Sequence, residues 1–137
     1  MAETFRLEVI TPERVFYEGD VELLMLKTLD GYEGYMANHN WQVKLLDTGE
    51  MKIRLPGKKY LLAATTGGYI DVAEKILVYV DAAEWPEEID VERALRSKAN
   101  AEQILKNQSQ QSIVEIQSAK IDILKAINRI NVKNAHF

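Results

Sequence analysis

The first part of the chain alternates between apolar and polar residues as β-strands do. Phe5, Leu7 and Val9 fall on one face of an extended segment, and Arg6 and Glu8 fall on the other. This two-residue period is typical of a strand with one buried face. Further apolar runs follow at short intervals: VFY (15–17), VELLMLKTL (21–29), MKIRL (51–55), KYLLAAT (59–65), YIDVA (69–73) and KILVYVDA (75–82).

Turn-forming residues separate these runs. Gly19-Asp20 predicts a break after the second run, and Asp30-Gly31 with Gly34 predicts the next corner. Later corners are expected at Pro56-Gly57, Gly67-Gly68 and Glu74-Lys75. The run at 21–29 is almost continuously apolar, which predicts a strand covered on both faces. Many short strands without intervening helices predict an antiparallel β-sandwich.

The period changes to three or four residues after residue 90, as in amphipathic helices. One helix is expected from Val91 to about Lys106, and a second from about Gln110 to Ile130. The apolar stripe of the second helix consists of Ile116, Ala119, Ile123, Ala126, Ile127 and Ile130, and it is widened by Ile113, Val114, Ile121 and Leu124. This stripe exceeds what the first helix can cover, so it needs a further surface, either the sandwich or a partner.

The segment between the helices, KNQSQQS (106–112), contains two alternative helix starts. Asn107 with Gln110 forms one capping-box pattern and Ser112 with Glu115 forms another, and only one of them can begin the second helix. Either start makes an antiparallel αα-hairpin. The predicted fold class is therefore α+β, with a β-sandwich domain at residues 1–86 and a helical hairpin domain at residues 87–137.

Composition narrows the class of protein. A chain of 137 residues with 47% hydrophobic and 28% charged residues is typical of a small globular protein. No apolar run is long enough for a membrane helix, and the N-terminus resembles neither a secretory signal nor a transit peptide. We therefore expect the chain to stay in the compartment where it is made. Because cysteine is absent, disulfides, thiolate metal sites and cysteine nucleophiles are excluded.

The charges are unevenly distributed along the chain. Residues 1–89 carry 16 acidic and 9 basic residues, whereas residues 90–137 carry 5 acidic and 8 basic ones. Opposite signs predict two partners, or one part folding back on the other. The acidic strand part disfavours a nucleic-acid role, because phosphate backbones require a positive surface. His39 and His136 have no carboxylate or cysteine at ligand spacing, so we expect no metal site.

Several motifs follow one another in a definite order. FRLEVITPERVFYEGDVELLML (5–26) contains a Thr-Pro-x-Arg turn, and GGYIDV (67–72) begins with Gly-Gly-aromatic. EIDVERA (88–94) contains Ile-Asp-x-x-Arg-Ala, and KAINRINV (125–132) lies near the end of the chain. In this order and spacing, the motifs resemble the family of epsilon subunits of bacterial F-type ATP synthase over nearly the whole sequence.

The resemblance implies a non-catalytic subunit of the rotor's central stalk, on the cytoplasmic face of the bacterial inner membrane. The expected partners are the gamma subunit, the ring of c subunits and, through the hairpin, the catalytic beta subunit. In such proteins the sandwich joins gamma to the c ring during proton- or sodium-driven ATP synthesis, and the extended hairpin inhibits ATP hydrolysis. No nucleic acid is expected, and membrane contact is expected only through the complex. The alternative is a stand-alone nucleotide-sensing module.

The segment DGYEGYMANHNWQVKLL (30–46) stands where the family has a Gly-Glu-x-Gly loop ending in Pro-Gly-His-Ala-Pro-Leu. Only Gly31, Gly34 and His39 keep this pattern, while Tyr32 occupies the usual glutamate position and Glu33 follows it. The resemblance implies that this loop contacts gamma or the c ring. The expected contact residues are Gly31, Tyr32, Glu33, Gly34, His39 and Trp41.

Arg93 occupies an unfavourable position for an isolated helix. With Asp90 as the N-cap, it lies in the first turn, where a cation opposes the helix dipole. A bound phosphate would turn this penalty into an attraction, because helix N-termini and guanidinium groups both attract anions. The alternative is that Arg93 pairs with Asp90, with Glu92 or with a carboxylate of the sandwich.

The resemblance implies that Arg93 belongs to a regulatory ATP site. The matching positions are Glu84, Ile89, Asp90, Arg93, Ala94, Lys125 and Arg129. Lys125 replaces an arginine of the family, and Asn100 lies near where another basic residue is expected, which should weaken phosphate binding. No Gly-x-x-x-x-Gly-Lys-Ser/Thr loop is present, so nothing indicates hydrolysis of this ATP.

Lys125, Arg129 and Lys133 are spaced four residues apart, and no acidic residue follows Asp122. They form one basic face on the last turns of the second helix. Complementarity to the helix dipole explains a charge or two there, but three on one face indicate an anionic partner. In the family, that partner is an acidic segment of the beta subunit. The same side chains would then bind either ATP or beta, which makes the two states mutually exclusive.

Overall fold

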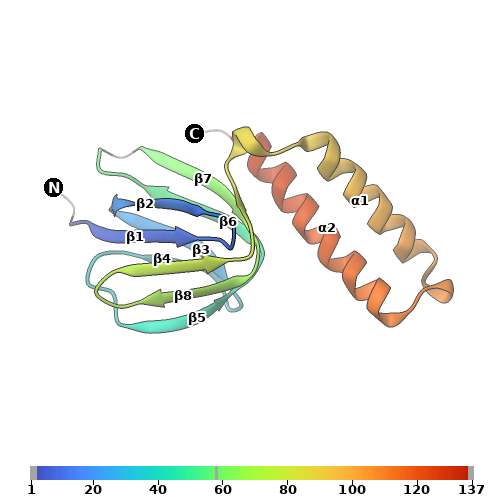
Figure 1. Cartoon of the computed structure of the whole chain (residues 1–137), viewed down its shortest axis with the longest axis horizontal. Helices are drawn as coiled ribbons and strands as arrows, with labels where there is room; N and C mark the ends of the chain where they lie inside the picture. The colour runs from blue at the N-terminus through green and yellow to red at the C-terminus, as the bar shows by residue number, and fades with distance from the viewer. Residues whose placement is uncertain (1–2, 58, 136–137) are drawn as a thin grey trace.

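The computed structural model describes residues 3–57 and 59–135, in which a strand-rich part precedes two long helices (Figure 1). The strands are β1 (Phe5–Ile10), β2 (Val15–Val21), β3 (Leu23–Thr28), β4 (Gly31–Tyr35), β5 (Gln42–Leu46), β6 (Gly49–Arg54), β7 (Tyr60–Thr65), β8 (Gly68–Val72), β9 (Ile76–Val80) and β10 (Ala83–Glu84). A 3₁₀ turn, η1 (Pro86–Glu88), leads to helix α1 (Val91–Lys106), and η2 (Gln108–Gln110) leads to α2 (Ile113–Asn134). The predicted α+β class, a β-sandwich followed by a helical hairpin, is confirmed.

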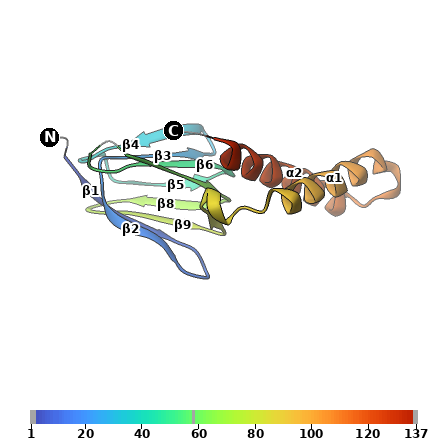
Figure 2. The ribbon, with the colours of Figure 1, turned by 90° about the horizontal axis from the view of Figure 1, so that it is seen from above.

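The strands form two layers that are joined at one edge (Figure 2). One layer has the order β10-β7-β6-β3 with β4 also paired to β3, and the other has the order β5-β8-β9-β1-β2. A single pairing of Thr28 with Leu46 links β3 to β5. Among the described strands, β1 and β9 pair in parallel and the other pairs are antiparallel. The predicted antiparallel β-sandwich is thus present, with one parallel pair that the sequence pattern did not indicate.

The core lies between the two layers and follows the predicted alternation. Leu7 and Val9 of β1 are fully buried, while Arg6 on the opposite face is exposed. In β3, the inward residues are buried but Leu23 and Met25 are only half-buried. The outer face of β3 is therefore only partly covered, and the prediction of full burial on both faces was wrong. An apolar run by itself does not show how much of the outer face is covered.

Two predicted breaks became strand. Gly19 and Asp20 lie inside β2, where they pair with Leu7 and Arg6 of β1. The expected loop at 31–41 instead contains β4, which pairs with β3, and it ends just before β5, which pairs with β8. Pairing with a neighbouring strand outweighs local turn propensity here. The corner at Asp30-Gly31 does exist, and Gly31 adopts a φ of 116° that favours glycine.

The helix boundaries resolve the two alternative capping patterns. The hydroxyl of Ser112 accepts a hydrogen bond from the backbone N–H of Glu115 at 3.1 Å, so Ser112 is the N-cap of α2. Asn107 ends α1 instead and makes no side-chain cap. Helix α2 continues to Asn134, four residues beyond the predicted end at Ile130. None of the described helices combines the length and apolar character that a membrane crossing requires.

The hairpin projects from one end of the sandwich and touches it mainly through the last turns of α2 (Figure 1). The contact has its own small apolar cluster, in which Val132 of α2 and Ile89 pack with Leu62 and Ala64 of β7. Besides Val132, the buried residues of the two helices are Ala94, Ala101, Ala119 and Ala126. The four residues that widen the apolar stripe, Ile113, Val114, Ile121 and Leu124, are exposed. In this arrangement the sandwich covers only the C-terminal end of the stripe.

Candidate functional site

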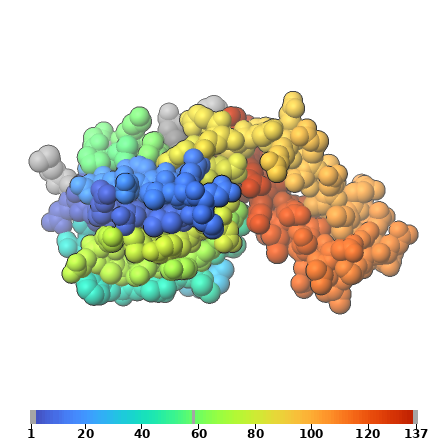
Figure 3. All heavy atoms as spheres, viewed as in Figure 1, coloured from blue at the N-terminus to red at the C-terminus, as the bar shows by residue number. Residues whose placement is uncertain are grey.

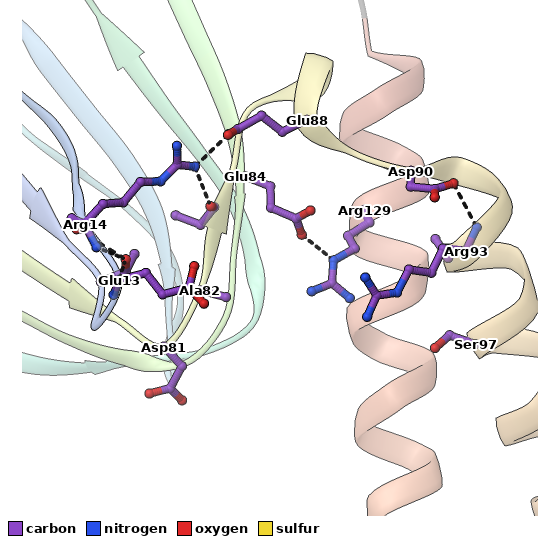
Figure 4. A pocket seen from close by; sticks show the side chains of 13 residues that line it. Glu13, Arg14, Asp81, Ala82, Glu84, Glu88, Asp90, Arg93, Ser97 and Arg129 are labelled. Carbon is purple, nitrogen blue, oxygen red and sulfur yellow. Dashed lines mark hydrogen bonds and ion pairs between the residues drawn. The ribbon is translucent and has the colours of Figure 1, made fainter.

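A cleft of about 700 Å³ separates the end of the sandwich from the hairpin. Figure 3 shows the hollow between the strands and α2, and Figure 4 shows the side chains that line it. Its walls come from the β1–β2 turn, the strand β10 with its preceding residues, the first turns of α1, and α2. Elements distant in sequence therefore meet at this cleft.

Arg93 enters the cleft from the N-terminus of α1. The carboxylate of Asp90 caps this helix by accepting a hydrogen bond from the backbone N–H of Arg93 at 3.1 Å. No ion pair or hydrogen bond to the Arg93 guanidinium occurs within the described part of the chain, and Figure 4 shows the group extending toward Arg129. The alternative pairing of Arg93 with a nearby carboxylate is therefore not what the structure contains. An unpaired guanidinium beside a helix N-terminus favours an anionic ligand.

Glu84 and Arg129 face each other across the cleft. The Nε–H of Arg129 donates to Oε1 of Glu84 at 2.5 Å, and both side chains are about 30% exposed. Lys133, one helical turn further along α2, donates to the carbonyl of Pro86 at 2.8 Å. These contacts join β10 and η1 to the basic face of the second helix, so docking of α2 engages two of its three predicted cations.

Arg14 was missed by the sequence analysis, although it belongs to the Thr-Pro-x-Arg turn that the analysis quoted. Its guanidinium donates to Glu88 at 2.8 Å and to the carbonyl of Ala83 at 3.5 Å, and it lies over the ring of Phe16. The hydrogen bond from Arg14, with a second from the backbone N–H of Trp85, lowers the pKa of the Glu88 carboxyl. Arg14 thereby ties the β1–β2 turn to η1, at the base of the hairpin.

The structure gathers most of the residues predicted for ligand binding. The predicted residues that line the cleft are Glu84, Asp90, Arg93, Ala94 and Arg129. Ile89 is instead buried in the apolar docking cluster, and Lys125 lies one helical turn before Arg129, outside the cleft lining. Asn100 is exposed on α1 and does not line the cleft either. Five of the seven predicted residues thus line one cleft, and Ile89 and Lys125 do not.

The six residues predicted for the contact loop do not form one loop. Gly31, Tyr32, Glu33 and Gly34 run along β4, whereas His39 and Trp41 belong to the turn before β5. Glu33 holds two partners, because Lys44 donates to Oε1 and Tyr35 donates to Oε2. These hydrogen bonds lower the pKa of Glu33, while burial raises the pKa of Tyr35. Glu33 is therefore a structural residue of the sandwich edge.

Trp41 belongs to an exposed apolar surface that the sequence analysis did not identify. We call this surface the outer face; it consists of Trp41, Val43, Leu45, Tyr69 and Tyr79. Trp41 is 70% exposed, and Val43 and Leu45 are each more than 60% exposed. The rings of Tyr69 and Tyr79 stack at 4.8 Å on neighbouring strands. A contiguous exposed apolar surface marks a protein contact site.

Metal chemistry finds no support in the described residues, in which no group of three or more histidine, cysteine, aspartate or glutamate side chains is placed to hold an ion. His136 lies outside the described residues. His39 packs its ring against Tyr35 and contacts the carbonyl of Asn40. Its role is local packing at the turn before β5.

Comparison with known protein families finds matches to both parts of the chain. Residues 4–86 match the family described as ATP synthase, Delta/Epsilon chain, beta-sandwich domain. Residues 87–134 match ATP synthase, Delta/Epsilon chain, long alpha-helix domain. Together the two matches span nearly all of the sequence.

Individual proteins agree with these matches. An ATP synthase epsilon chain of Ruminococcus albus is 44% identical over 132 residues, which cover 95% of this chain and 96% of the relative. One from Caldicellulosiruptor bescii is 41% identical and covers 96% and 94%. A chain of the Euglena gracilis mitochondrial ATP synthase (OSCP/F1/c-ring) superposes with a TM-score of 0.76 at 23% identity, covering 90% of this chain and 79% of its own. A chain of the Tetrahymena thermophila mitochondrial ATP synthase central stalk and c ring gives 0.66 at 16% identity, covering 97% and 98%. At these identities the structural likeness shows the fold.

Proposed function

The chain belongs to the ATP synthase epsilon-chain family, and on this premise we propose that it is the non-catalytic subunit of the central stalk, at the cytoplasmic face of a bacterial membrane. The two solved structures come from ATP synthase assemblies that include the c ring, which supports this place in the complex. In it, the sandwich holds gamma to the c ring, so that rotation driven by protons or sodium ions reaches the catalytic subunits.

We assign the gamma contact to the outer face. Val43 and Leu45 alternate with polar residues along β5, so their side chains stand on the outside of the layer. Tyr69 lies opposite Leu45, and Tyr79 lies opposite Tyr69. The result is a row of large apolar side chains across three strands. Trp41 extends the outer face to the turn that was predicted to contact gamma or the c ring.

ATP is the ligand that suits the cleft. The observation that carries this proposal is the convergence of Arg93 and Arg129 on one cleft, beside the N-terminus of α1. Arg14 and Arg129 are already paired with carboxylates, so Arg93 is the cation most available to a phosphate. Asp90 and Glu84 can accept hydrogen bonds from the adenine amine or a ribose hydroxyl. ATP would then bridge α1 and α2 at the base of the hairpin.

Bound ATP would hold the hairpin in its docked position. In this position Arg129 contacts Glu84 and Lys133 contacts the Pro86 carbonyl, so neither is fully available to another anion. Release of the hairpin would expose both cations together with Lys125. They would then face the acidic surface of the beta subunit and inhibit ATP hydrolysis. Docked and extended states thus compete for the same basic face.

The test of ligand binding is a calorimetric titration of ATP into the full chain, compared with Arg93→Ala. We expect Arg93→Ala to weaken binding about tenfold or more, because it removes a charge-assisted hydrogen bond to phosphate. Arg96→Ala is the matched control, since Arg96 is exposed on the same helix and does not line the cleft. Equal affinity of the wild type and Arg93→Ala would contradict the site as drawn.

A further inference from the structure

Asn128 joins α2 directly to the backbone of the sandwich. Its side-chain amide nitrogen donates to the carbonyl of Gly49 at 2.9 Å and makes a longer contact with the carbonyl of Thr65 at 3.4 Å. Gly49 and Thr65 are paired neighbours on β6 and β7. One side-chain amide of the hairpin therefore contacts two strands of the sandwich at once.

These carbonyls also have partners within the sandwich. Gly49 and Thr65 are both buried and lie opposite each other on β6 and β7, and the hydroxyl of Thr65 donates to the Gly49 carbonyl at 3.2 Å. The polar group that depends on the contact is therefore the half-buried amide of Asn128, whose hydrogen-bond partners are these two carbonyls. A partly buried amide that loses its partners carries a desolvation cost.

Apolar packing alone does not determine how far α2 slides along the sandwich. Val132 is the α2 residue in the docking cluster, and Asn128 and Leu124 precede it at intervals of one helical turn. A slide by one turn, about 5.4 Å, would bring Leu124 to the carbonyls and Asn128 into the apolar cluster. The second exchange would leave the Asn128 amide without a partner among apolar side chains. A polar residue in an otherwise apolar seam selects one register in the same way in coiled coils.

We propose that Asn128 is the positioning residue that sets the register of the docked hairpin. With Asn128 on the Gly49 carbonyl, the next residue, Arg129, reaches Glu84, and Lys133 reaches the Pro86 carbonyl. Only the consequence of this inference rests on the proposed function: the docked hairpin is the form that presents Arg93 and Arg129 to ATP. The docking itself depends on no ligand.

The experiment measures the distance between the two parts of the full chain without ATP. The sequence has no cysteine, so spin labels at Glu74→Cys on the sandwich and Glu102→Cys on α1 are the only labels introduced. Both positions are exposed. We expect one narrow distance distribution with Asn128 intact. Asn128→Ala and Asn128→Asp should shift or broaden it, lowering the equilibrium constant for docking about tenfold, because each removes the donor.

Asn131 provides the matched control, because it is exposed on the same helix and has no contact with the sandwich among the described residues. Asn131→Ala and Asn131→Asp should leave the distance unchanged. Wild-type distances in both Asn128 variants, or equal broadening in the Asn131 variants, would overturn the proposal. Calorimetry with ATP separates this proposal from the proposed ligand. If the Asn128 variants lose docking but the wild type binds no ATP, only the ligand is refuted. If the wild type binds ATP but the Asn128 variants dock normally, only the role of Asn128 is refuted.

Discussion

Glu84 and Arg129 lie 45 residues apart in the sequence, yet the carboxylate of one accepts a hydrogen bond from the guanidinium of the other at 2.5 Å. Glu84 belongs to the last strand of the sandwich and Arg129 to the last turns of α2. This pair therefore links the sandwich directly to the hairpin. Any movement of α2 away from the sandwich must break it.

Weakening the docking cluster, which consists of Leu62, Ala64, Ile89 and Val132, should release the last turns of α2 from the sandwich. Val132→Ala removes two methyl groups from a fully buried side chain, which weakens docking by about 1.5 kcal/mol. Amide hydrogens in the last turns of α2 should then exchange about tenfold faster, while those of the sandwich core keep their rates. Val114→Ala is the control, because Val114 is 75% exposed on the same helix. Equal exchange in both variants would argue against the cluster as the main attachment.

A side chain at Gly68, the first residue of β8, should lower the stability of the whole sandwich. A Cβ on Gly68 would lie 1.8 Å from the carbonyl oxygen of Tyr79 on the paired strand. Gly68→Ala should therefore lower the free energy of unfolding by more than about 2 kcal/mol in urea denaturation. Gly34→Ala should be tolerated far better, because the nearest atom to its Cβ would be 3.6 Å away. Similar stabilities for the two variants would count against this strand pairing.

The pair formed by Arg14 and Glu88 predicts a defined dependence on pH. Hydrogen bonds from Arg14 and from the Trp85 backbone lower the pKa of Glu88 below its ordinary value of 4.5. Its contribution is therefore present above that value and is lost as the pH falls through the lower pKa of the folded state. Glu88→Gln should reduce the fall in unfolding free energy between about pH 6 and about pH 3.

Glu87→Gln serves as the control for this pH series, because Glu87 is the exposed neighbour of Glu88 and does not line the cleft. It should leave the pH profile of the wild type nearly unchanged. Identical pH profiles for Glu88→Gln and the wild type would mean that the ion pair between Arg14 and Glu88 contributes nothing to stability.

The basic face predicts a change in the activity of the assembled complex. Reversing the charges of Lys125, Arg129 and Lys133 to glutamate should relieve inhibition of ATP hydrolysis several-fold in a reconstituted ATP synthase, because the acidic surface of beta would then be repelled. The control reverses three cations elsewhere on the hairpin: Arg96, Lys106 and Lys120. Unchanged inhibition in the first variant, or equal relief in both, would contradict the role of this face.

Local patterns predicted those parts of the fold that depend on local physics. The period of apolar residues predicted α1 at its observed bounds, and Ser112 with Glu115 was one of two capping patterns from which the structure selects. Strands β4 and β5 were missed, because Gly31, Gly34 and the intervening polar residues favour a turn. Their conformation depends on pairing with β3 and β8, which the residue pattern within each segment does not reveal.

In the cleft, too, the sequence predicted contacts within one helical turn but not contacts between distant segments. Asp90 and Arg93 lie in one helical turn, so the sequence alone predicted their chemistry and their position relative to each other. Arg14 and Asn128 were not identified, because their partners lie 74 and 79 residues away in the sequence. Ile89 was predicted as a ligand contact, but its apolar side chain packs in the docking cluster. Tertiary contacts thus determine which motif residues face the cleft.

If ATP in the cleft keeps the hairpin docked, ATP must control the distance between the labelled sandwich and α1 in the assembled complex. At saturating ATP, we expect the short, narrow distance of the docked arrangement. After removal of ATP, we expect a longer distance as the basic face leaves Glu84 for the beta subunit. The same distance distribution with and without ATP would contradict this control of the hairpin by ATP.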